Sequence, residues 1–335
     1  RGDVHYWEVW HGNKPFSEYR KYFFRYASEF GFQSFPSVKT LETVTDDPKE
    51  LNPFSYVMEK HQRNYGGNGK IAKYMQAAYR YPENFSDFVY ASQLLQADGI
   101  RYGVEHYRRN RGRCMGAIYW QLNDCWPVIS WSSIDYYGRW KALHYYVKRF
   151  FAPVMLSCEE QSWMTVEADM NRQHFEFEKS IRLNVTNETL DAHRVLVKWA
   201  VRKTDATILR EEEQWLEVPA LSAVWMDKVE LPQIDCFNEY VSYEAWENDQ
   251  IISQGTVIFS YPKYFRYLNP GLTVRVDGDE IVVKAEAYAK SVEIRNENDD
   301  LILEDNYFDM NAGEYRVKIL DGKPDGLKVR SVYDI

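Results

Sequence analysis

Cysteine is scarce in this sequence, and the few cysteines are scattered. Cys114, Cys125, Cys158 and Cys236 form no pair with the short spacing of a metal-binding site. We therefore expect reduced thiols in a cytoplasmic protein, with a disulfide as the alternative. The sequence indicates no metal site and no cofactor.

The chain also lacks an excess of positive charge and any long apolar run. Its 335 residues include 41 Lys and Arg against 50 Asp and Glu, a net charge of -9. This balance argues against nucleic acid or an anionic membrane surface as a partner. No stretch is apolar enough to span a membrane. The chain opens Arg1-Gly-Asp-Val-His5 with neither an initiator Met nor a signal peptide, so we expect a processed start or a piece of something longer.

Aromatic residues, in contrast, are abundant. They make up 16% of the chain, with 11 Trp and 26 Tyr. Most of these rings are explained by a large hydrophobic core. Because saccharide-binding enzymes also use rings as stacking platforms, the richness mildly favours a sugar site.

The first 150 residues alternate between strand-like and helix-like patterns, which predicts a parallel α/β sheet or barrel. Ser86 is a candidate N-cap for the longest helix, which we expect to end near residue 109. The predicted strands cover residues 22–29 and 115–122, and the predicted helices cover residues 55–63, 70–79, 87–109 and 138–149.

Polar residues on the predicted helices have simple structural explanations. We interpret Glu105, Arg108 and Arg109 as a solvated helix face. For His61 and His106, solvated or capping roles are favoured over catalysis.

Glu29 is the first candidate for chemistry. It follows a dense apolar and aromatic run, and a carboxylate at the end of a buried strand is costly unless it is paired, hydrogen-bonded or used. The structural alternative is an ion pair with a nearby cation such as Arg25.

From residue 154 onward the pattern is all β. Alternating segments separated by polar turns predict a sandwich, and Asp277-Gly278 marks a hairpin turn in a smaller β unit. The strands show no ladder of rings beyond what a core needs. We therefore divide the chain into a barrel segment (1–153), an immunoglobulin-like β-sandwich (154–262) and a small C-terminal β-sandwich (263–335).

Three separated motifs carry a family resemblance. Tyr26-Ala-Ser-Glu-Phe-Gly-Phe-Gln-Ser-Phe-Pro36, Met115-Gly-Ala-Ile-Tyr-Trp-Gln-Leu-Asn-Asp124 and Lys141-Ala-Leu-His-Tyr-Tyr-Val-Lys-Arg-Phe-Phe-Ala-Pro153 together resemble β-mannosidases of glycoside hydrolase family 2. The resemblance implies the C-terminal part of a (β/α)8 TIM barrel followed by two immunoglobulin-like β-sandwich domains. It implies a retaining exo-β-mannosidase that hydrolyses terminal β-D-mannose residues.

The resemblance also implies roles for individual residues. Glu29 corresponds to the nucleophile at the end of strand seven, and Trp120 is similar to the tryptophan that lines the sugar subsite. Asn123 and Asp124 would lie at the same rim. The family also has sugar contacts at or near the end of strand six, and the resemblance implies that one or more of His5, Tyr6 and Trp7 make them here.

The general acid has no counterpart in the sequence. The family carries it in an Asn-Glu pair upstream of the nucleophile. The Asn-Glu pairs here are Asn187-Glu188, Asn238-Glu239 and Asn296-Glu297, all downstream of Glu29. We therefore predict that the general acid/base is missing and that the chain alone is inactive.

Two other functions stay open. One is another exo-β-glycosidase of the same family, a galactosidase, glucuronidase or glucosaminidase. The other is a non-catalytic carbohydrate-binding β-sandwich fragment. The expected partners are a β-mannoside or oligosaccharide substrate, and either the missing N-terminal half of the enzyme or a second copy of the chain. Nucleic acid and membranes are not expected.

Overall fold

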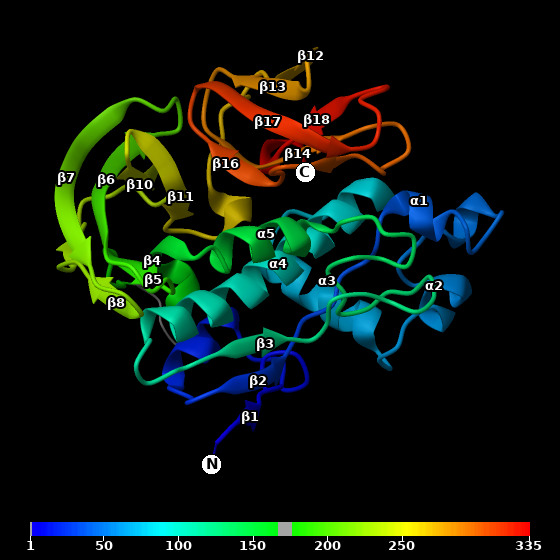
Figure 1. Ribbon diagram of the computed structural model, residues 1–335. Coiled ribbons are helices and arrows are strands. Elements are labelled where there is room, and N and C mark those ends of the chain that lie inside the picture. The colour runs from blue at the N-terminus through cyan, green and yellow to red at the C-terminus, as the bar shows by residue number, and fades with distance from the viewer. Residues whose placement is uncertain (1, 167–175) are drawn as a thin grey trace.

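A computed structural model describes residues 2–166 and 176–335. Residue 1 and residues 167–175, which belong to the first two predicted domains, lie outside the described residues. Figure 1 shows a small parallel sheet, a β-sandwich and a C-terminal β unit around a long central helix, α4 (Phe85–Arg109). All four cysteines are free thiols. In the two described ranges, no helix has the length and apolar character needed to cross a membrane.

The predicted parallel sheet is present near the N-terminus. Its three strands are β1 (Val4–His5), β2 (Ala27–Phe30) and β3 (Ala117–Tyr119), in the order β1-β2-β3 with parallel pairing throughout. The strands are shorter than predicted, and the third is not buried, because Ile118 is 52% exposed. β3 lies at an edge of the sheet, so nothing pairs with its outer side within the described residues.

The observed helices confirm the predicted alternation of strands and helices, but they begin and end at other residues than predicted. Asn84, not Ser86, caps α4: its side-chain oxygen accepts a hydrogen bond of 3.0 Å from the backbone N–H of Asp87. Asn84 is extended while Ser86 is already helical, so only Asn84 can occupy the capping position. The other helices are α1 (Val38–Leu41), α2 (Tyr56–Lys60), α3 (Gly67–Ala78) and α5 (Ala142–Phe150), with a 3-10 turn at Phe16–Lys21.

The C-terminal part of α4 corrects one prediction. Glu105, Arg108 and Arg109 are buried rather than solvated, because the helix runs between the parallel sheet and the β-sandwich. Arg109 is 1% exposed and pairs with Glu105 at 3.4 Å. His106 is also buried, and its Nε2 donates to the carbonyl oxygen of Tyr22 at 2.9 Å. Burial lowers the pKa of His106 to about 4, so the ring is neutral at pH 7.

The β-sandwich follows directly. Its first sheet has the order β4-β5-β8, with β9 also pairing β5, and its second has the order β11-β10-β6-β7. Apolar residues from both sheets form one shared core. The strands are β4 (Val154–Gln161), β5 (Ser180–Asn187), β6 (His193–Lys203), β7 (Ile208–Val218), β8 (Ser222–Trp225), β9 (Val229–Glu230), β10 (Glu239–Glu247) and β11 (Gln250–Ile258).

The C-terminal unit also contains two sheets, of order β12-β13-β17-β15 and β16-β14-β18. The predicted hairpin joins β12 and β13, with Gly278 at positive φ in its turn. This unit packs on α4 and α5, and its apolar residues join those of the parallel sheet in one core. Its strands are β12 (Thr273–Asp277), β13 (Glu280–Ala285), β14 (Ala289–Arg295), β15 (Ile302–Leu303), β16 (Phe308–Met310), β17 (Gly313–Asp321) and β18 (Lys328–Arg330).

Candidate active site

Glu29 lies near the C-terminal end of β2, the middle strand of the parallel sheet. Its carboxylate accepts a hydrogen bond of 2.9 Å from Nε1 of Trp7, and Nδ1 of His5 lies 3.6 Å from the same oxygen. The side chain keeps 25% of its surface exposed. The alternative ion pair with Arg25 does not form within the described residues. The carboxylate is therefore fixed by neighbouring side chains yet open to solvent on one side.

The side chains of the three N-terminal candidates, His5, Tyr6 and Trp7, alternate in direction along the chain. His5 and Trp7 reach Glu29, whereas Tyr6 points the opposite way and is 7% exposed. The ring of Tyr6 packs against Tyr19 and Tyr22, with centroid distances of 5.7 and 5.1 Å. Burial raises the pKa of Tyr6 above its ordinary value. The structure thus places Tyr6 in the core and the other two beside the carboxylate.

A glycine allows the strand ends to converge. A Cβ atom on Gly31 would lie 2.4 Å from the carbonyl oxygen of Trp120, and close to the rings of Trp7 and Trp131. No side chain fits there without backbone movement. Gly31 therefore lets three tryptophans gather immediately after Glu29.

Trp120 lines a pocket that connects to Glu29 indirectly, because Trp131 in the same pocket contacts Trp7, the hydrogen-bond donor to Glu29. Its backbone N–H donates to the carbonyl oxygen of Phe30 at 2.7 Å, which ties the end of β3 to the end of β2. Its ring remains 45% exposed. The pocket has a volume of about 310 Å³ and is lined by Arg63, Trp120, Gln121, Asn123, Asp124, Cys125, Trp126, Val128, Ser130 and Trp131.

The two polar rim candidates differ in environment. Asn123 is exposed, whereas Asp124 is only 9% exposed. The carboxylate of Asp124 accepts hydrogen bonds from the hydroxyls of Ser130 at 2.7 and 2.9 Å and of Ser132 at 2.5 Å. Asp124 is therefore a fixed acceptor at the pocket wall, and Asn123 is a solvent-facing one.

A buried lysine, Lys141, contacts the loop that carries this part of the pocket. Nζ of Lys141 lies 3.2 Å from Oγ of Ser34 and 3.4 Å from the carbonyl oxygen of Ser130. Burial lowers the pKa of Lys141 to about 8, and the charges of Asp124 and Asp135 act against that shift. Lys141 thus joins the loop after Glu29 to the loop that carries Asp124.

Sequence reasoning missed several residues of this arrangement. Trp131 lies 6.1 Å from Trp7 between ring centroids and forms a second aromatic wall of the pocket. Trp131 and Ser130 lie in a loop without regular periodicity, so only their proximity in sequence to Trp120 could have suggested them. The role of Lys141 gave no signal, because a lysine at a helix start normally indicates a solvated position.

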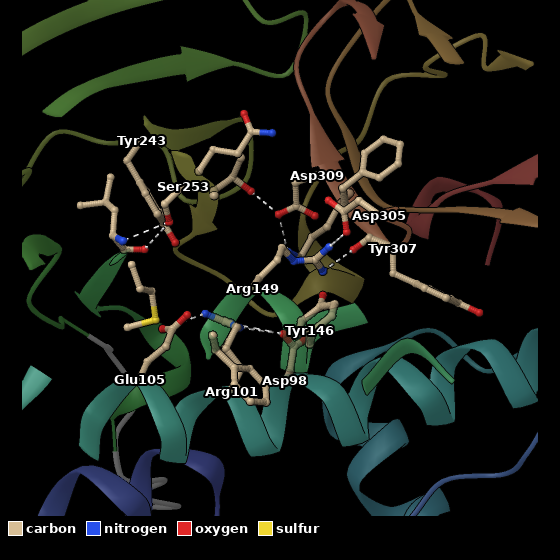
Figure 2. A pocket seen from close by; sticks show the side chains of 18 residues that line it. Asp98, Arg101, Glu105, Tyr146, Arg149, Tyr243, Ser253, Asp305, Tyr307 and Asp309 are labelled. Carbon is tan, nitrogen blue, oxygen red and sulfur yellow. Dashed lines mark hydrogen bonds and ion pairs between the residues drawn. The ribbon is translucent and has the colours of Figure 1, made fainter. Parts of the chain in front are cut away.

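A second pocket lies where the helices meet both β units, and it has a different character. Figure 2 shows Arg101 between Asp98 and Glu105, and Arg149 facing Asp305 across the junction. Its volume is about 80 Å³. Because these charges already neutralise one another, we assign it to the docking of the three units. The described residues contain no group of three or more side chains that could hold a metal ion.

Comparisons with known proteins show similarity to mannosidases. Residues 179–264 match the family model of a mannosidase Ig/CBM-like domain, and residues 267–335 match that of an Ig-fold domain of mannosidases. β-Mannosidase B of Thermothelomyces thermophilus is 29% identical over 361 residues, which cover 99% of this chain and 41% of that protein. The β-mannosidase of Capra hircus is 36% identical over 167 residues, covering 46% of this chain and 19% of the goat protein.

Solved structures give the same result over the whole chain. The β-D-mannosidase of Dictyoglomus thermophilum superimposes with a TM-score of 0.84 at 27% identity, over 98% of this chain and 40% of that one. An exo-chitosanase of Amycolatopsis orientalis shares the fold, with a TM-score of 0.66 at 16% identity. The chain spans about two fifths of the length of the relatives that it matches along its whole length. It is therefore a homologue of the β-mannosidases of glycoside hydrolase family 2.

Proposed function

We propose that the chain forms the C-terminal part of a retaining exo-β-mannosidase, with Glu29 as its nucleophile. One observation carries the proposal: a carboxylate stands at the end of the middle parallel strand and accepts a hydrogen bond from Trp7, whose ring contacts Trp131 in the wall of a tryptophan-lined pocket. Catalytic groups of (β/α)8 barrels lie at this end of the strands. We accordingly interpret β1, β2 and β3 as the last three strands of such a barrel.

The proposed chemistry begins with Glu29. Its ionised carboxylate attacks the anomeric carbon of a terminal mannoside and forms a covalent glycosyl-enzyme, which water then hydrolyses. The indole N–H of Trp7 donates to the carboxylate and keeps it oriented for attack. His5 lies at the same oxygen and supplies a second polar contact.

The pocket supplies the sugar-binding surface. Trp120 and Trp131 offer ring faces against which the apolar side of a hexose can pack. Asp124 and Asn123 supply hydrogen-bond acceptors at the rim. Because the hydroxyls of two serines already hold Asp124, we assign it to substrate orientation and not to proton transfer.

The proton donor must come from outside these residues. A retaining glycosidase needs a second carboxyl group about 5–5.5 Å from the nucleophile. Asn187 lies in β5, Asn238 immediately before β10, and Asn296 immediately after β14, so all three Asn-Glu pairs belong to the β units. We propose that the complete protein supplies the general acid from an earlier barrel strand.

An exposed apolar edge fits that proposal. Met115, Ile118 and Leu122 are 52–56% exposed along and beside β3. Unpaired strand edges and apolar patches of this kind normally pack against a partner. We propose that the rest of the barrel covers this edge, since the matched relatives are more than twice as long as the chain. Self-association is the alternative, which sedimentation of the isolated chain would reveal as a dimer that Ile118→Asp dissociates.

Hydrolysis of an aryl β-mannoside tests the assignment. In the complete protein we expect Glu29→Gln to lower kcat by at least about a thousandfold, because the nucleophile is lost. Glu59→Gln is the matched control, since Glu59 is an exposed glutamate on α2. Comparable activity of Glu29→Gln and the control would reject the proposal.

The isolated chain provides a second test. We expect it to show no turnover of the same substrate, because one of the two carboxyl groups is absent. A panel of aryl β-galactoside, β-glucuronide and β-glucosaminide on the complete protein distinguishes the other sugars of the family. Preference for any of these over the mannoside would replace the proposed specificity.

A further inference from the structure

The outer face of the β-sandwich carries two tryptophans in one cross-strand row. Leu196 on β6 pairs directly with Trp215 on β7 and with Trp246 on β10. Residues directly opposite in antiparallel strands share a face and lie about 4.5–5.5 Å apart between Cα atoms. The two tryptophans therefore flank Leu196 at a separation of about 10 Å.

This row faces away from the sandwich core. Val195 and Val197, the chain neighbours of Leu196, are fully buried, so Leu196 points outward. Trp215 is 55% exposed, and Trp246 is partly exposed. Figure 1 shows β7 at the margin of the molecule, away from the helices. The row is accessible and lies on a different unit from the pocket that Trp120 lines.

Cations hold both rings in position. The guanidinium of Arg194 lies 4.7 Å from the ring centroid of Trp215, and the ammonium of Lys198 lies 5.5 Å from that of Trp246. Nε1 of Trp246 also donates to Glu244 at 2.8 Å. Large rings that are exposed and held in place suit the binding of a flat partner, because little side-chain freedom is lost when the partner arrives.

The surrounding charges restrict what that partner can be. Arg194 pairs with Glu217 at 3.3 Å, and Lys198 pairs with Glu213 at 3.5 Å. Paired cations leave no positive potential for a nucleic acid, an acidic polysaccharide or an anionic membrane. The same side chains can exchange hydrogen bonds with hydroxyl groups. The face is thus complementary to a neutral, hydroxyl-rich molecule.

We propose that this row, Trp215–Leu196–Trp246, binds an extended neutral β-linked hexose chain. The Cα atoms of the two tryptophans lie about 10 Å apart, which is comparable to the advance of two sugar residues along such a chain, so alternate sugars stack on the two rings. Binding at this site goes beyond the proposed hydrolysis, whereas the choice of a β-mannan as its ligand and the role of the site rest on the proposed function. That role is to hold a polymer on the surface while the chain end is hydrolysed elsewhere.

Titration of the chain with β-1,4-mannohexaose tests the proposal by calorimetry. We expect Trp215→Ala and Trp246→Ala each to weaken binding about tenfold, the effect of removing one stacked aromatic face. Leu196→Arg keeps both rings but places a charge between them, and it should weaken binding similarly. Tyr81→Ala is the control, because Tyr81 is an 88% exposed ring outside the row, and it should bind as the parent does. Matching thermal unfolding confirms that each variant is folded.

Three results would overturn the proposal. The first is unchanged affinity in both tryptophan variants. The second is equal loss in the Tyr81 control. The third is a fall in molecular mass on Trp215→Ala, which would show that a second copy covers the face. Trp120→Ala separates this site from the pocket that Trp120 lines: row binding should persist in that variant, even if the hydrolysis assigned to Glu29 proves wrong.

Discussion

A buried ion pair between the parallel-sheet region and the sandwich allows a quantitative prediction. Nη2 of Arg20 lies 2.7 Å from Oε2 of Glu160 on β4, and Nη1 donates to the backbone oxygen of Glu160 at 2.7 Å. The hydroxyl of Tyr102 on α4 donates to the other carboxylate oxygen. The side chains of Arg20 and Glu160 are 12% and 4% exposed. Burial alone would raise the pKa of Glu160, but Arg20 and Tyr102 together hold it below its ordinary value.

Removal of either Arg20 or Glu160 leaves the other charge buried in the interface without its partner. We expect Glu160→Met or Arg20→Met to lower the free energy of unfolding by about 3–5 kcal/mol. The double variant Arg20→Met/Glu160→Met should lose only about 1 kcal/mol, mainly because the hydroxyl of Tyr102 is left without its acceptor. Most of the single-variant loss is thus the penalty of an unpaired buried charge.

Urea unfolding of the four proteins, followed by tryptophan fluorescence, measures this cycle. Below the pKa of Glu160 the pair is lost, so the difference between the parent and Glu160→Met should shrink in acid and stay constant near neutrality. A double variant that loses the sum of the two single losses would refute the reasoning. So would single losses below about 1 kcal/mol, the range of exposed ion pairs.

Three further predictions concern the candidate site. Gly31→Ala should destabilise the chain by about 1–3 kcal/mol, because the new methyl group would lie 2.4 Å from a backbone oxygen. Gly69→Ala is the control: its methyl group has open space within α3, so this variant should be neutral or stabilising. Urea unfolding compares the two variants. Lys141 has a pKa of about 8 in the folded chain and 10.5 in the unfolded chain, so its contribution to the free energy of unfolding should rise by up to about 1.4 kcal/mol per pH unit between pH 8 and 10.5. Chemical unfolding at several pH values measures this slope, which Lys141→Met should abolish. An unchanged slope in that variant would contradict the assignment. Trp7→Phe removes the donor to Glu29 and should lower kcat of the complete protein about tenfold on an aryl β-mannoside with little change in folding; unaltered kcat would exclude an orienting role.

Local patterns in the sequence predicted much of the fold. Alternation of strand-like and helix-like patterns predicted the parallel pairing of β2 and β3, and Asp277-Gly278 predicted its hairpin turn. The burial of Arg109 could not be predicted in this way. Its helix is covered by the sandwich, a unit that follows some fifty residues later, and helical periodicity contains no information on such docking.

The candidate site shows the same division. The cost of burying a carboxylate singles out Glu29 in the sequence, and strand alternation explains why His5 and Trp7 face it while Tyr6 does not. The second aromatic wall, Trp131, lies in a loop whose path is set by tertiary contacts. The row on the sandwich was missed entirely, since Trp215 and Trp246 become neighbours of Leu196 only through strand pairing.

Covalent trapping tests the central claim most directly. A 2-deoxy-2-fluoro-β-mannosyl substrate with a good leaving group slows hydrolysis of the glycosyl-enzyme, so the intermediate accumulates on the nucleophile. In the complete protein we expect one fluoromannosyl group per chain, on Glu29, in the peptide that contains Ser-Glu-Phe-Gly. Attachment to any other carboxylate, or stoichiometric labelling of Glu29→Gln, would contradict the account.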